Sequence, residues 1–365
     1  LINNKSYTVP MTIEESSVVA AASKAAKFWM HHGGFKSEVI KTEKIGQVHF
    51  IFNGEKNIIK EYFDFVKPYL FENTKEITKN MQSRGGGINE IELIDKSTEL
   101  DGYYQIFATF NTVDAMGANF INSCLEEFAQ TFCNSIKKFD DKKLNKKDIN
   151  IIMSILSNFV PNCIVKSSVS CRVSELNNLE PETKDFAEKF VKAIRIANID
   201  MHRAVTHNKG VMNGIDAVAI ATGNDFRAIE AGAHAYASIG KYKSLSNAYI
   251  KNEIFYFELK LPLAIGTIGG VTNLHPLVKL ALEILDNPDS KELMNIMASV
   301  GLAQNFGALR SLVTSGIQKG HMRMHLMNLL NKNNASEKEK EIASDYFKNK
   351  IVSSSTVEKF IKNIR

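Results

Sequence analysis

Apolar and polar residues recur with two different periods along the first half of the chain. Residues 14–28 carry valines and alanines on one helical face, and Gly33-Gly34 follows as a stop signal. A second group of segments begins near Gly46 and predicts, in order, a strand at 47–52, a helix at 57–70, strands at 88–94 and 103–111, a helix at 114–139 and a strand at 162–173. The order strand-helix-strand-strand-helix-strand is that of a ferredoxin-like unit, in which two helices cover one face of an antiparallel sheet.

The second half of the chain is richer in helical periodicity. The pattern predicts helices at 183–198, 225–239, 277–285 and 290–312, with a strand at 252–261. Beyond Leu330 the composition shifts to Asn, Lys, Glu and Ser, which indicates a linker at 331–334 and short helices at 337–348 and 356–364. We therefore expect an α+β protein whose helix-rich large domain is interrupted by the ferredoxin-like unit and followed by a small, mobile helical tail.

Length and composition narrow the class of protein. A chain of 365 residues exceeds the roughly 250–300 residues that one core usually supports, so two domains are expected. No apolar run of about 18 residues is present, which predicts no membrane span, and the first residues lack the apolar core of a signal peptide. Four cysteines without C-x-x-C spacing are typical of buried free thiols in a reducing cytoplasm, so we expect a cytoplasmic protein.

The charge pattern argues against nucleic acid and metal as ligands. The formal net charge is +5, and the densest lysine run, 137–147, is interrupted by aspartates, as in a solvated loop rather than a phosphate-binding stripe. His321 and His325 lie four residues apart, but no third ligand follows and there is no H-E-x-x-H motif. We expect neither a nucleic-acid partner nor a bound metal.

Three short segments contain residues suited to carbonyl reduction. They hold Lys209, Asp225 and His321 among glycines and small residues that suggest turns. A lysine beside a carboxylate can stabilise a developing oxyanion, and a histidine can protonate a leaving group. Taken singly, each residue is more often a solvated or structural side chain.

Other residues allow two interpretations. Glu15 and Ser17 near the start of the first predicted helix are either a capping pair or, with Glu15 in a pocket, a proton donor. Arg203 could bind a substrate carboxylate through two parallel hydrogen bonds. The run Asp114-Ala115-Met116-Gly117-Ala118-Asn119 joins a strand to a helix and is either tight packing or a phosphate site at the helix start. It does not match G-x-G-x-x-G, and the turn at 266–273 is equally ambiguous.

Taken together, these segments resemble class II hydroxymethylglutaryl-coenzyme A reductases, the bacterial and archaeal type. The resemblance covers nearly the whole chain in order, through the motifs V-P-M-T-I-E-E-S-S-V-V-A-A-A-S (9–23), D-A-M-G-A-N (114–119), H-N-K-G-V-M-N-G-I-D (207–216), A-T-G-N-D (221–225), G-T-I-G-G-V-T-N (266–273) and G-H-M (320–322). One departure is Ser16, which stands where the family most often has proline. A segment of the type Glu-Asn-x-x-Gly, which serves the partner subunit's site in the family, is also absent from the sequence.

The resemblance implies a four-electron reduction of the HMG-CoA thioester to mevalonate and coenzyme A by two reduced nicotinamide cofactors. It implies that Lys209 stabilises the oxyanion of each hydride step, that Asp225 keeps Lys209 charged and bonds Glu15, and that Glu15 supplies a proton in the aldehyde reduction. His321 would protonate the departing thiolate. Ser17, Arg203 and Asn213 would bind the hydroxymethylglutaryl end, and the six residues from Asp114 to Asn119 would bind the cofactor.

The resemblance also implies the domain plan and the assembly. The large substrate domain would span residues 1–42 and 175–320, the ferredoxin-like NAD(P)-binding domain 43–174, and a C-terminal flap 321–365. The family acts as a dimer, so we expect a homodimer or a higher even oligomer. Between NADH and NADPH, Lys79 and Arg84 without a nearby aspartate favour NADPH.

Two competing hypotheses remain open from the sequence. A coenzyme A thioester hydrolase or lyase with a lysine-stabilised enolate would use similar residues but no nicotinamide. A catalytically silent coenzyme A- or nucleotide-binding protein is disfavoured because all four candidate catalytic residues are present. An assay with HMG-CoA and each reduced nicotinamide separates these hypotheses.

Overall fold

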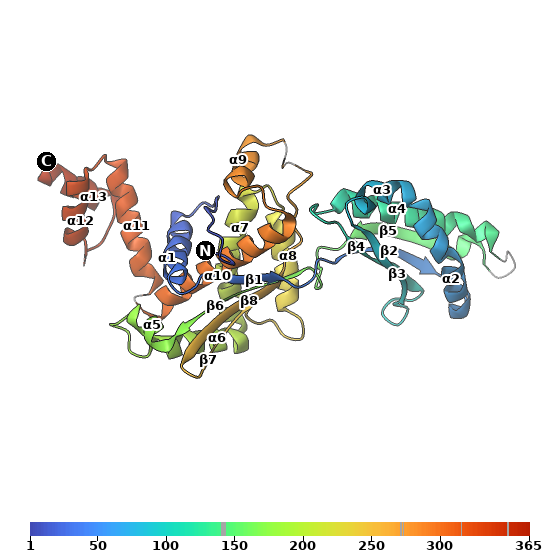
Figure 1. The fold of residues 1–365 in the computed structure, drawn as a ribbon, viewed down its shortest axis with the longest axis horizontal. Coiled ribbons are helices and arrows are strands. Elements are labelled where there is room, and N and C mark those ends of the chain that lie inside the picture. The colour runs from blue at the N-terminus through green and yellow to red at the C-terminus, as the bar shows by residue number, and fades with distance from the viewer. Residues whose placement is uncertain (140–143, 271, 273, 315, 349) are drawn as a thin grey trace.

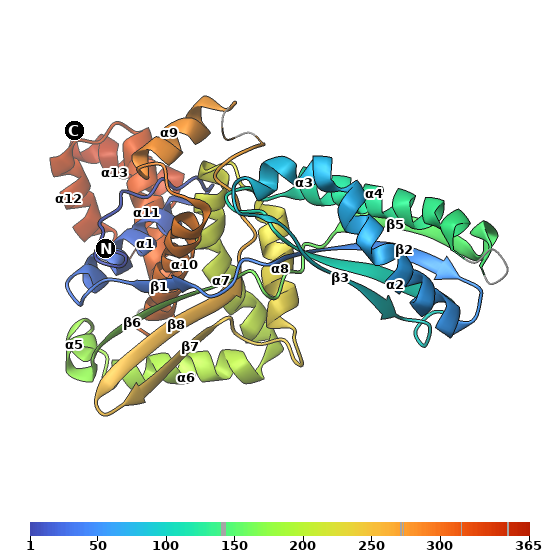
Figure 2. The same ribbon diagram turned by 45° about the vertical axis from the view of Figure 1, so that its right-hand side comes forward.

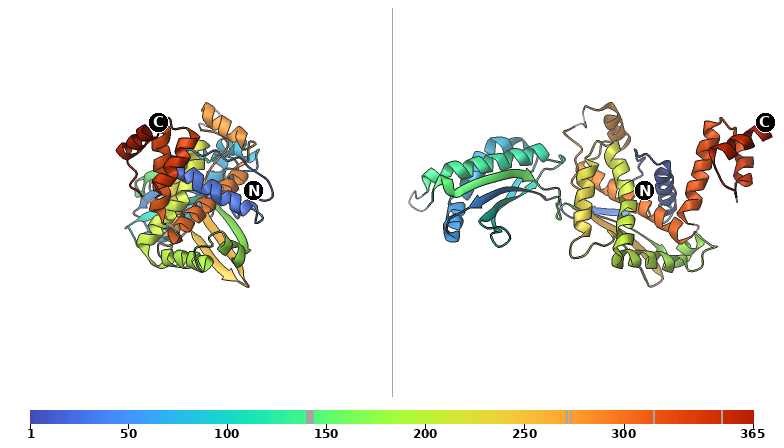
Figure 3. Two further views of the ribbon diagram at one scale, coloured as in Figure 1. Left: turned by 90° about the vertical axis from the view of Figure 1, so that its left-hand side faces the viewer. Right: turned by 180° about the vertical axis from the view of Figure 1, so that it is seen from behind.

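The chain folds into three bodies that lie in a row (Figure 1). The computed structural model describes residues 1–139, 144–270, 272, 274–314, 316–348 and 350–365, without the side chains of residue 146 and residues 317–324. A small mixed body lies at one end, a large body in the middle, and the C-terminal helices at the other end. The view from behind in Figure 3 shows the same order. The mixed helix and sheet content is that of an α+β protein.

The small body contains an antiparallel sheet with helices on one face (Figure 2). Its strands pair in the order β3-β4-β2-β5, and they are β2 (Lys44–Phe52), β3 (Gly87–Asp95), β4 (Tyr103–Asn111) and β5 (Ile149–Leu156). The helices are α2 (Lys56–Asn73), α3 (Lys75–Gln82), α4 (Ala118–Asn134) and the short 3₁₀ turns η1 (Ser135–Lys138) and η2 (Lys146–Asp148). Alternate residues of β4 are buried because successive side chains of a strand point to opposite faces, and the inner face packs on α2 and α4.

The last strand of this sheet corrects the sequence prediction. The strand expected at 162–173 forms, as β6 (Ile164–Arg172), but it pairs in the sheet of the large body. Its predicted place is taken by β5, which the pattern did not indicate. A register shift places an extra residue, Ile152, in β5 opposite β2, and this bulge interrupts the alternation on which the prediction depends. Ile152 and Met153 are also more than half exposed.

The large body surrounds a second antiparallel sheet, in the order β1-β6-β8-β7. Its other strands are β1 (Lys36–Val39), β7 (Ser246–Lys251) and β8 (Ile254–Pro262). The helices are α1 (Ser16–Met30), α5 (Val173–Asn178), α6 (Phe186–Ile199), α7 (Met201–Ala221), α8 (Phe226–Ala237), α9 (Pro276–Ile284) and α10 (Ser290–Val313). The expected helices of this half are present with ends shifted by a few residues, whereas α7 was not predicted.

Helix α10 forms the centre of the large body. It is buried around most of its circumference and packs against α1, α7 and the sheet. Phe306 of α10 forms an aromatic cluster with Trp29, Phe190 and Phe255. The ring centroids of Trp29 and Phe306 lie 5.1 Å apart in an edge-to-face arrangement. Burial of each such ring contributes about 1.5–3 kcal/mol, so this cluster holds α1, α6, β8 and α10 in fixed relation.

The C-terminal body has its own small core. It comprises α11 (Ile317–Lys332), α12 (Glu337–Tyr346) and α13 (Ser354–Ile364). Leu326, Leu329 and Leu330 of α11 pack with apolar residues of the two following helices. The linker expected at 331–334 therefore falls within this body, because α11 continues to Lys332.

The helices in the described part of the chain all lack the combination of length and apolar character that a membrane span requires.

Candidate active site

The H-N-K-G motif lies in the middle of α7, not in the turn that its glycine suggested. Gly214, four residues further on, is required by close packing: a Cβ there would lie 2.8 Å from both the Gln304 Cβ and the Val300 carbonyl oxygen of α10. At Gly210 the nearest contact of an added Cβ would be 3.9 Å from Ala308. Glycine here allows two helices to approach closely, and the helix ladder keeps the segment helical.

Two residues of the motif anchor α7 to residues 243–246, where the chain enters β7. His207 Nε2 lies 2.7 Å from Ser246 Oγ. The Asn208 side chain donates to the Lys243 carbonyl (2.9 Å) and accepts from Leu245 N (2.9 Å). Both residues are buried. Burial, with the nearby Arg203 charge, lowers the pKa of His207 to about 3. His207 is therefore neutral and structural rather than a proton donor.

The next residue, Lys209, points to the opposite side of α7 and is exposed. Asn213 and Asp216 follow at spacings of four and three, which place them on the same face of the helix. Arg203 at the start of α7 is half-buried, and burial lowers its pKa. The face of α7 defined by Lys209, Asn213 and Asp216 is called the polar face below. It holds a cation, an amide and a carboxyl group in line.

Asp216 is a site residue that sequence reasoning missed. Burial raises its pKa to about 8, and a hydrogen bond and the charge of Glu230, together with the charge of Glu14, act in the same direction. The charge of Lys209 opposes them. The Asp216 Oδ1 atom is buried without a hydrogen-bond partner in the described part of the chain. The D at the end of the motif was the available signal, but nothing in the sequence indicated that α8 brings Glu230 beside it.

Glu15 and Ser17 reach this region at the start of α1. Thr12 N donates to the Ala217 carbonyl oxygen of α7 (2.9 Å), which holds the segment before α1 against the end of the polar face. Ser17 Oγ donates to the Glu15 carboxylate. Glu15 occupies the N-cap position without a side-chain cap bond to the helix, so its carboxylate is not used as the helix cap.

Asp225 is the N-cap of α8 in this structure. It accepts hydrogen bonds from Arg227 N (3.1 Å) and Ala228 N (3.3 Å) and forms an ion pair with the Arg227 guanidinium (3.1 Å). Among the described residues, no hydrogen bond or ion pair joins it to Lys209. The side chain of His321, on α11, lies outside the described residues. The structure thus holds the segment before Glu15 against the Ala217 end of the polar face, and leaves Asp225 paired with Arg227.

The loop from Asp114 to Asn119 joins β4 to α4 where the small body meets the large body. Thr267 N donates to the Asp114 carbonyl oxygen (2.8 Å), and Ser290 N at the start of α10 donates to Asp114 Oδ1 (2.9 Å). Gly117 has φ +92° and ends the loop, and α4 starts without a side-chain cap or an acid in its first turn. Asp114 forms its hydrogen bonds with the large body and α4 has no side-chain cap, so the helix start keeps unpaired N–H groups suited to an anion.

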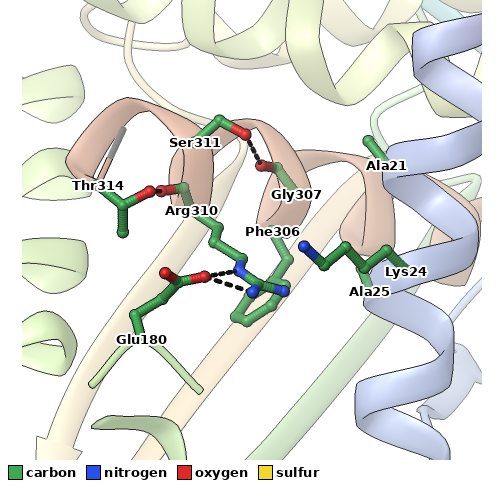
Figure 4. A pocket seen from close by; sticks show the side chains of 9 residues that line it. All are labelled: Ala21, Lys24, Ala25, Glu180, Phe306, Gly307, Arg310, Ser311 and Thr314. Atoms are coloured by element: carbon green, nitrogen blue, oxygen red, sulfur yellow. Dashed lines mark hydrogen bonds and ion pairs between the residues drawn. The ribbon is translucent and has the colours of Figure 1, made fainter. Parts of the chain in front are cut away.

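A cavity of about 230 Å³ lies between α1, α10 and the chain after α5 (Figure 4). Arg310 forms an ion pair with Glu180 across it, and Lys24 extends into it from α1. None of the expected site residues whose side chains are described lines this cavity. It therefore adds a polar surface next to the base of α11, separate from the polar face of α7. The described residues contain no cluster of His, Cys, Asp or Glu that could hold a metal ion.

Comparisons with known proteins place this geometry in context. The family model of hydroxymethylglutaryl-coenzyme A reductase matches residues 1–326. A relative from Archaeoglobus fulgidus, 3-hydroxy-3-methylglutaryl-coenzyme A reductase, is 37% identical over 330 residues, which cover 90% of this chain and 72% of the relative. A probable reductase from Borreliella burgdorferi is 33% identical over 348 residues, which cover 93% of this chain and 76% of the relative.

Solved structures give the same result. A 3-hydroxy-3-methylglutaryl-coenzyme A reductase from Streptococcus pneumoniae aligns with a TM-score of 0.78 at 36% identity, covering 100% of this chain and 85% of that chain. A class II reductase from the same organism, bound to NADPH in open conformations, aligns with a TM-score of 0.77 at 36% identity, covering 100% and 86%.

Proposed function

The chain belongs to the hydroxymethylglutaryl-coenzyme A reductase family, and from that premise we propose how its residues divide the work. The enzyme reduces HMG-CoA to mevalonate and coenzyme A with a reduced nicotinamide cofactor as reductant. A hydrolase or lyase without nicotinamide is not favoured. The observation that carries the residue assignment is the polar face of α7, where Lys209 is exposed while its neighbours His207 and Asn208 are buried.

Lys209 is assigned to the oxyanion. Each hydride step converts a carbonyl oxygen into an alkoxide, and a positioned ammonium group lowers the free energy of that state by about 2.7–4 kcal/mol. Because His207 and Asn208 fix the helix on its other side, the Lys209 backbone is rigid. Glu15, beside the polar face, is assigned to donate a proton to the aldehyde oxygen.

Asp225 is assigned to keep Lys209 charged and to bond Glu15. This assignment needs Asp225 to exchange its ion pair with Arg227 for one with Lys209. Asp225 is 42% exposed and Arg227 is 78% exposed, and an exposed ion pair of this kind contributes only about 0–1 kcal/mol. A substrate that covers the site can therefore displace Arg227 at small cost.

The remaining substrate contacts are assigned to one residue of the polar face, one residue near the start of α1 and one residue at the start of α7. Ser17, Arg203 and Asn213 would bind the carboxylate and hydroxyl groups of the hydroxymethylglutaryl end. Arg203 is the one permanent cation among them, and its partial burial strengthens its interaction with a carboxylate. His321 on α11 would give a proton to the departing thiolate, and residues 321–365 would act as the flap that closes over the site.

The cofactor is assigned to the loop of Asp114, Ala115, Met116, Gly117, Ala118 and Asn119. The uncapped start of α4 and the left-handed Gly117 fit a phosphate group, because both leave backbone N–H groups accessible. When bound, the reduced nicotinamide supplies the hydride. The chain's own contribution is to hold the phosphates at the border of the two bodies, next to the segment that carries Asp225.

NADPH is proposed as the preferred form. Arg84 is exposed just after α3, and Gly86, two residues further on, packs on Val113, which directly precedes the cofactor loop: a Cβ added at Gly86 would lie 2.9 Å from Val113 Cγ2. A cation beside the loop suits a ribose 2′-phosphate. We expect Arg84→Ala to raise KM for NADPH several-fold and leave KM for NADH unchanged, measured by steady-state kinetics. An equal change for both cofactors would contradict this role.

The domain plan and the dimer are proposed on the observed packing. We assign the ferredoxin-like cofactor domain to residues 44–156, which contain the βαββαβ sheet, and place 157–174 with the large domain because β6 pairs there.

A stripe of Leu277, Leu280 and Ile284 on α9 is 68%, 50% and 46% exposed. An apolar stripe of this kind suits a second copy of the chain, and light scattering would measure the oligomer.

One experiment tests the assignment of proton donors. Only thioester reduction expels a thiolate, so His321→Gln should reduce turnover of HMG-CoA strongly, while turnover of free mevaldehyde changes little. His325→Gln, four residues away on α11 and exposed, is the matched control and should leave both rates near those of the unmodified enzyme. Equal loss on both substrates would show that His321 acts elsewhere or is structural.

A further inference from the structure

Lys44, the first residue of β2, lies between the small body and the large body. Only 5% of its surface is exposed. Its Nζ donates to the Ala115 carbonyl oxygen (2.7 Å) and to Thr112 Oγ1 (2.5 Å). Thr112, itself 1% exposed, donates to the same carbonyl (2.6 Å). No other lysine of the described residues is as deeply buried. The ammonium group thus holds the cofactor loop (Asp114 to Asn119) near its start.

The environment of this ammonium lacks a paired anion. In the described part of the chain no carboxylate forms an ion pair with Lys44, and both of its hydrogen-bond acceptors are neutral. Burial lowers its pKa to about 8, against opposing effects from the Cys163 thiol and the Asp114 carboxylate. A buried cation with neutral partners carries a desolvation penalty, and a nearby anionic ligand would offset that penalty.

The place where such an anion would bind is adjacent. Ala115 lies three residues before Ala118, the first residue of α4, whose uncapped start carries the positive end of the helix dipole. Hydrogen bonds also connect this loop to the segment that contains Asn224. Thr267 N donates to the Asp114 carbonyl oxygen, and the neighbouring Gly266 N donates to the Asn224 side chain (2.9 Å). Asn224 directly precedes Asp225.

We propose that Lys44 is a positioning residue for cofactor binding: its ammonium fixes the Ala115 carbonyl and adds a positive charge behind the N-terminus of α4, where the phosphates of the dinucleotide bind. The inference rests on the proposed function, since that function places the dinucleotide at this loop. It predicts a change in cofactor affinity without a change in affinity for HMG-CoA, which binds at the polar face of α7.

Protonation of Lys44 then governs cofactor affinity. If only the charged form supports binding, affinity falls as Lys44 loses its proton, about twofold at pH 8 and about tenfold at pH 9 relative to low pH. Of the groups that face Lys44, the Cys163 thiol has a pKa raised to about 11 by burial and stays neutral over this range. Asp114 is the other charged group nearby.

The test compares Lys44→Met with Lys56→Met. Both variants lose one positive charge from the small body, but Lys56 lies beyond the opposite end of β2 and is 59% exposed beside Asp95. Calorimetric titration with NADPH at pH 7 should show at least tenfold weaker binding for Lys44→Met, normal binding for Lys56→Met, and KM for HMG-CoA within twofold for both. NADPH affinity of Lys44→Met within twofold of the unmodified enzyme, or equal losses for both substrates, would overturn the inference.

A second measurement uses the unmodified enzyme and does not depend on the variant folding. Its NADPH dissociation constant should rise about tenfold between pH 7 and pH 9, and a constant value over that range would overturn the inference. A failure of the proposed function gives a different result from a failure of the Lys44 inference. If the unmodified enzyme neither binds NADPH nor oxidises it with HMG-CoA, the proposed function itself is contradicted.

Discussion

The cofactor loop and the polar face of α7 differ in how completely one chain assembles them. The loop is held from both bodies by Lys44, Thr267 and Ser290. The polar face is open: Lys209 is exposed, and Asp225 is paired with Arg227. Such a difference is expected of an enzyme that binds its reductant on a preformed surface and completes the reacting centre only when substrate covers it.

The largest expected effect comes from the open side of this comparison. Lys209→Ala should lower kcat by at least about 100-fold with both HMG-CoA and mevaldehyde, because each hydride step creates an oxyanion. NADPH affinity should be unchanged, since the loop does not involve α7. Lys243→Ala, an exposed lysine near the same helix, is the control. Near-normal turnover of Lys209→Ala would remove Lys209 from the chemistry.

The next effect concerns the packing that presents the polar face. Gly214→Ala should destabilise the protein by about 1–3 kcal/mol, because the new methyl group meets Gln304 and Val300 of α10. Gly210→Ala is the matched control: its methyl group has space, and alanine favours a helix by about 1 kcal/mol. Chemical denaturation measures both variants. If the two alanines have the same effect, close approach of α7 and α10 does not explain the glycines.

The third expected effect is a pH dependence of stability. The pKa of Asp216 is about 8 in the folded enzyme and near 4 when unfolded, so the folded state keeps a proton that the unfolded state has released. The free energy of unfolding therefore falls between about pH 4 and pH 8 through this group. Asp216→Asn should remove that dependence and gain stability relative to the unmodified enzyme as pH rises.

Denaturation at pH 5, 7 and 9 measures this gain, with Asp64→Asn, an exposed aspartate of α2, as the control. A stability difference between Asp216→Asn and the unmodified enzyme that stays constant with pH would contradict a proton that the folded state keeps on Asp216.

Clean periodicity explains which elements the sequence predicted. Strand β4 has the bounds expected from its alternation, and α1 differs by two residues at each end. Strand β5 escaped because its bulge and its exposed Ile152 and Met153 break the period. Helix α7 escaped because the glycine of the H-N-K-G motif suggested a turn, whereas in the structure Gly210 lies within the helix and Gly214 allows α10 to approach closely.

Most of the proposed site residues are named by a motif in the sequence. The family resemblance listed Lys209, Glu15 and the loop from Asp114 to Asn119, and the structure gives their surroundings. Lys44 carries no local sign of its proposed role, because its burial and its bond to the Ala115 carbonyl oxygen depend on contacts between distant segments. The motif names Asp216, but its pairing with Glu230 likewise depends on a contact between distant segments. The pairing of Asp225 with Arg227, two residues away, is likewise a matter of conformation rather than of composition.

The stoichiometry of the complete reaction tests the central claim most directly. Limiting HMG-CoA is incubated with the unmodified enzyme and excess NADPH, and the oxidised cofactor, released coenzyme A and mevalonate are quantified together. The account predicts two NADPH oxidised for each coenzyme A released and each mevalonate formed. Release of coenzyme A without oxidation of NADPH or NADH would contradict it and indicate hydrolysis or cleavage of the thioester instead.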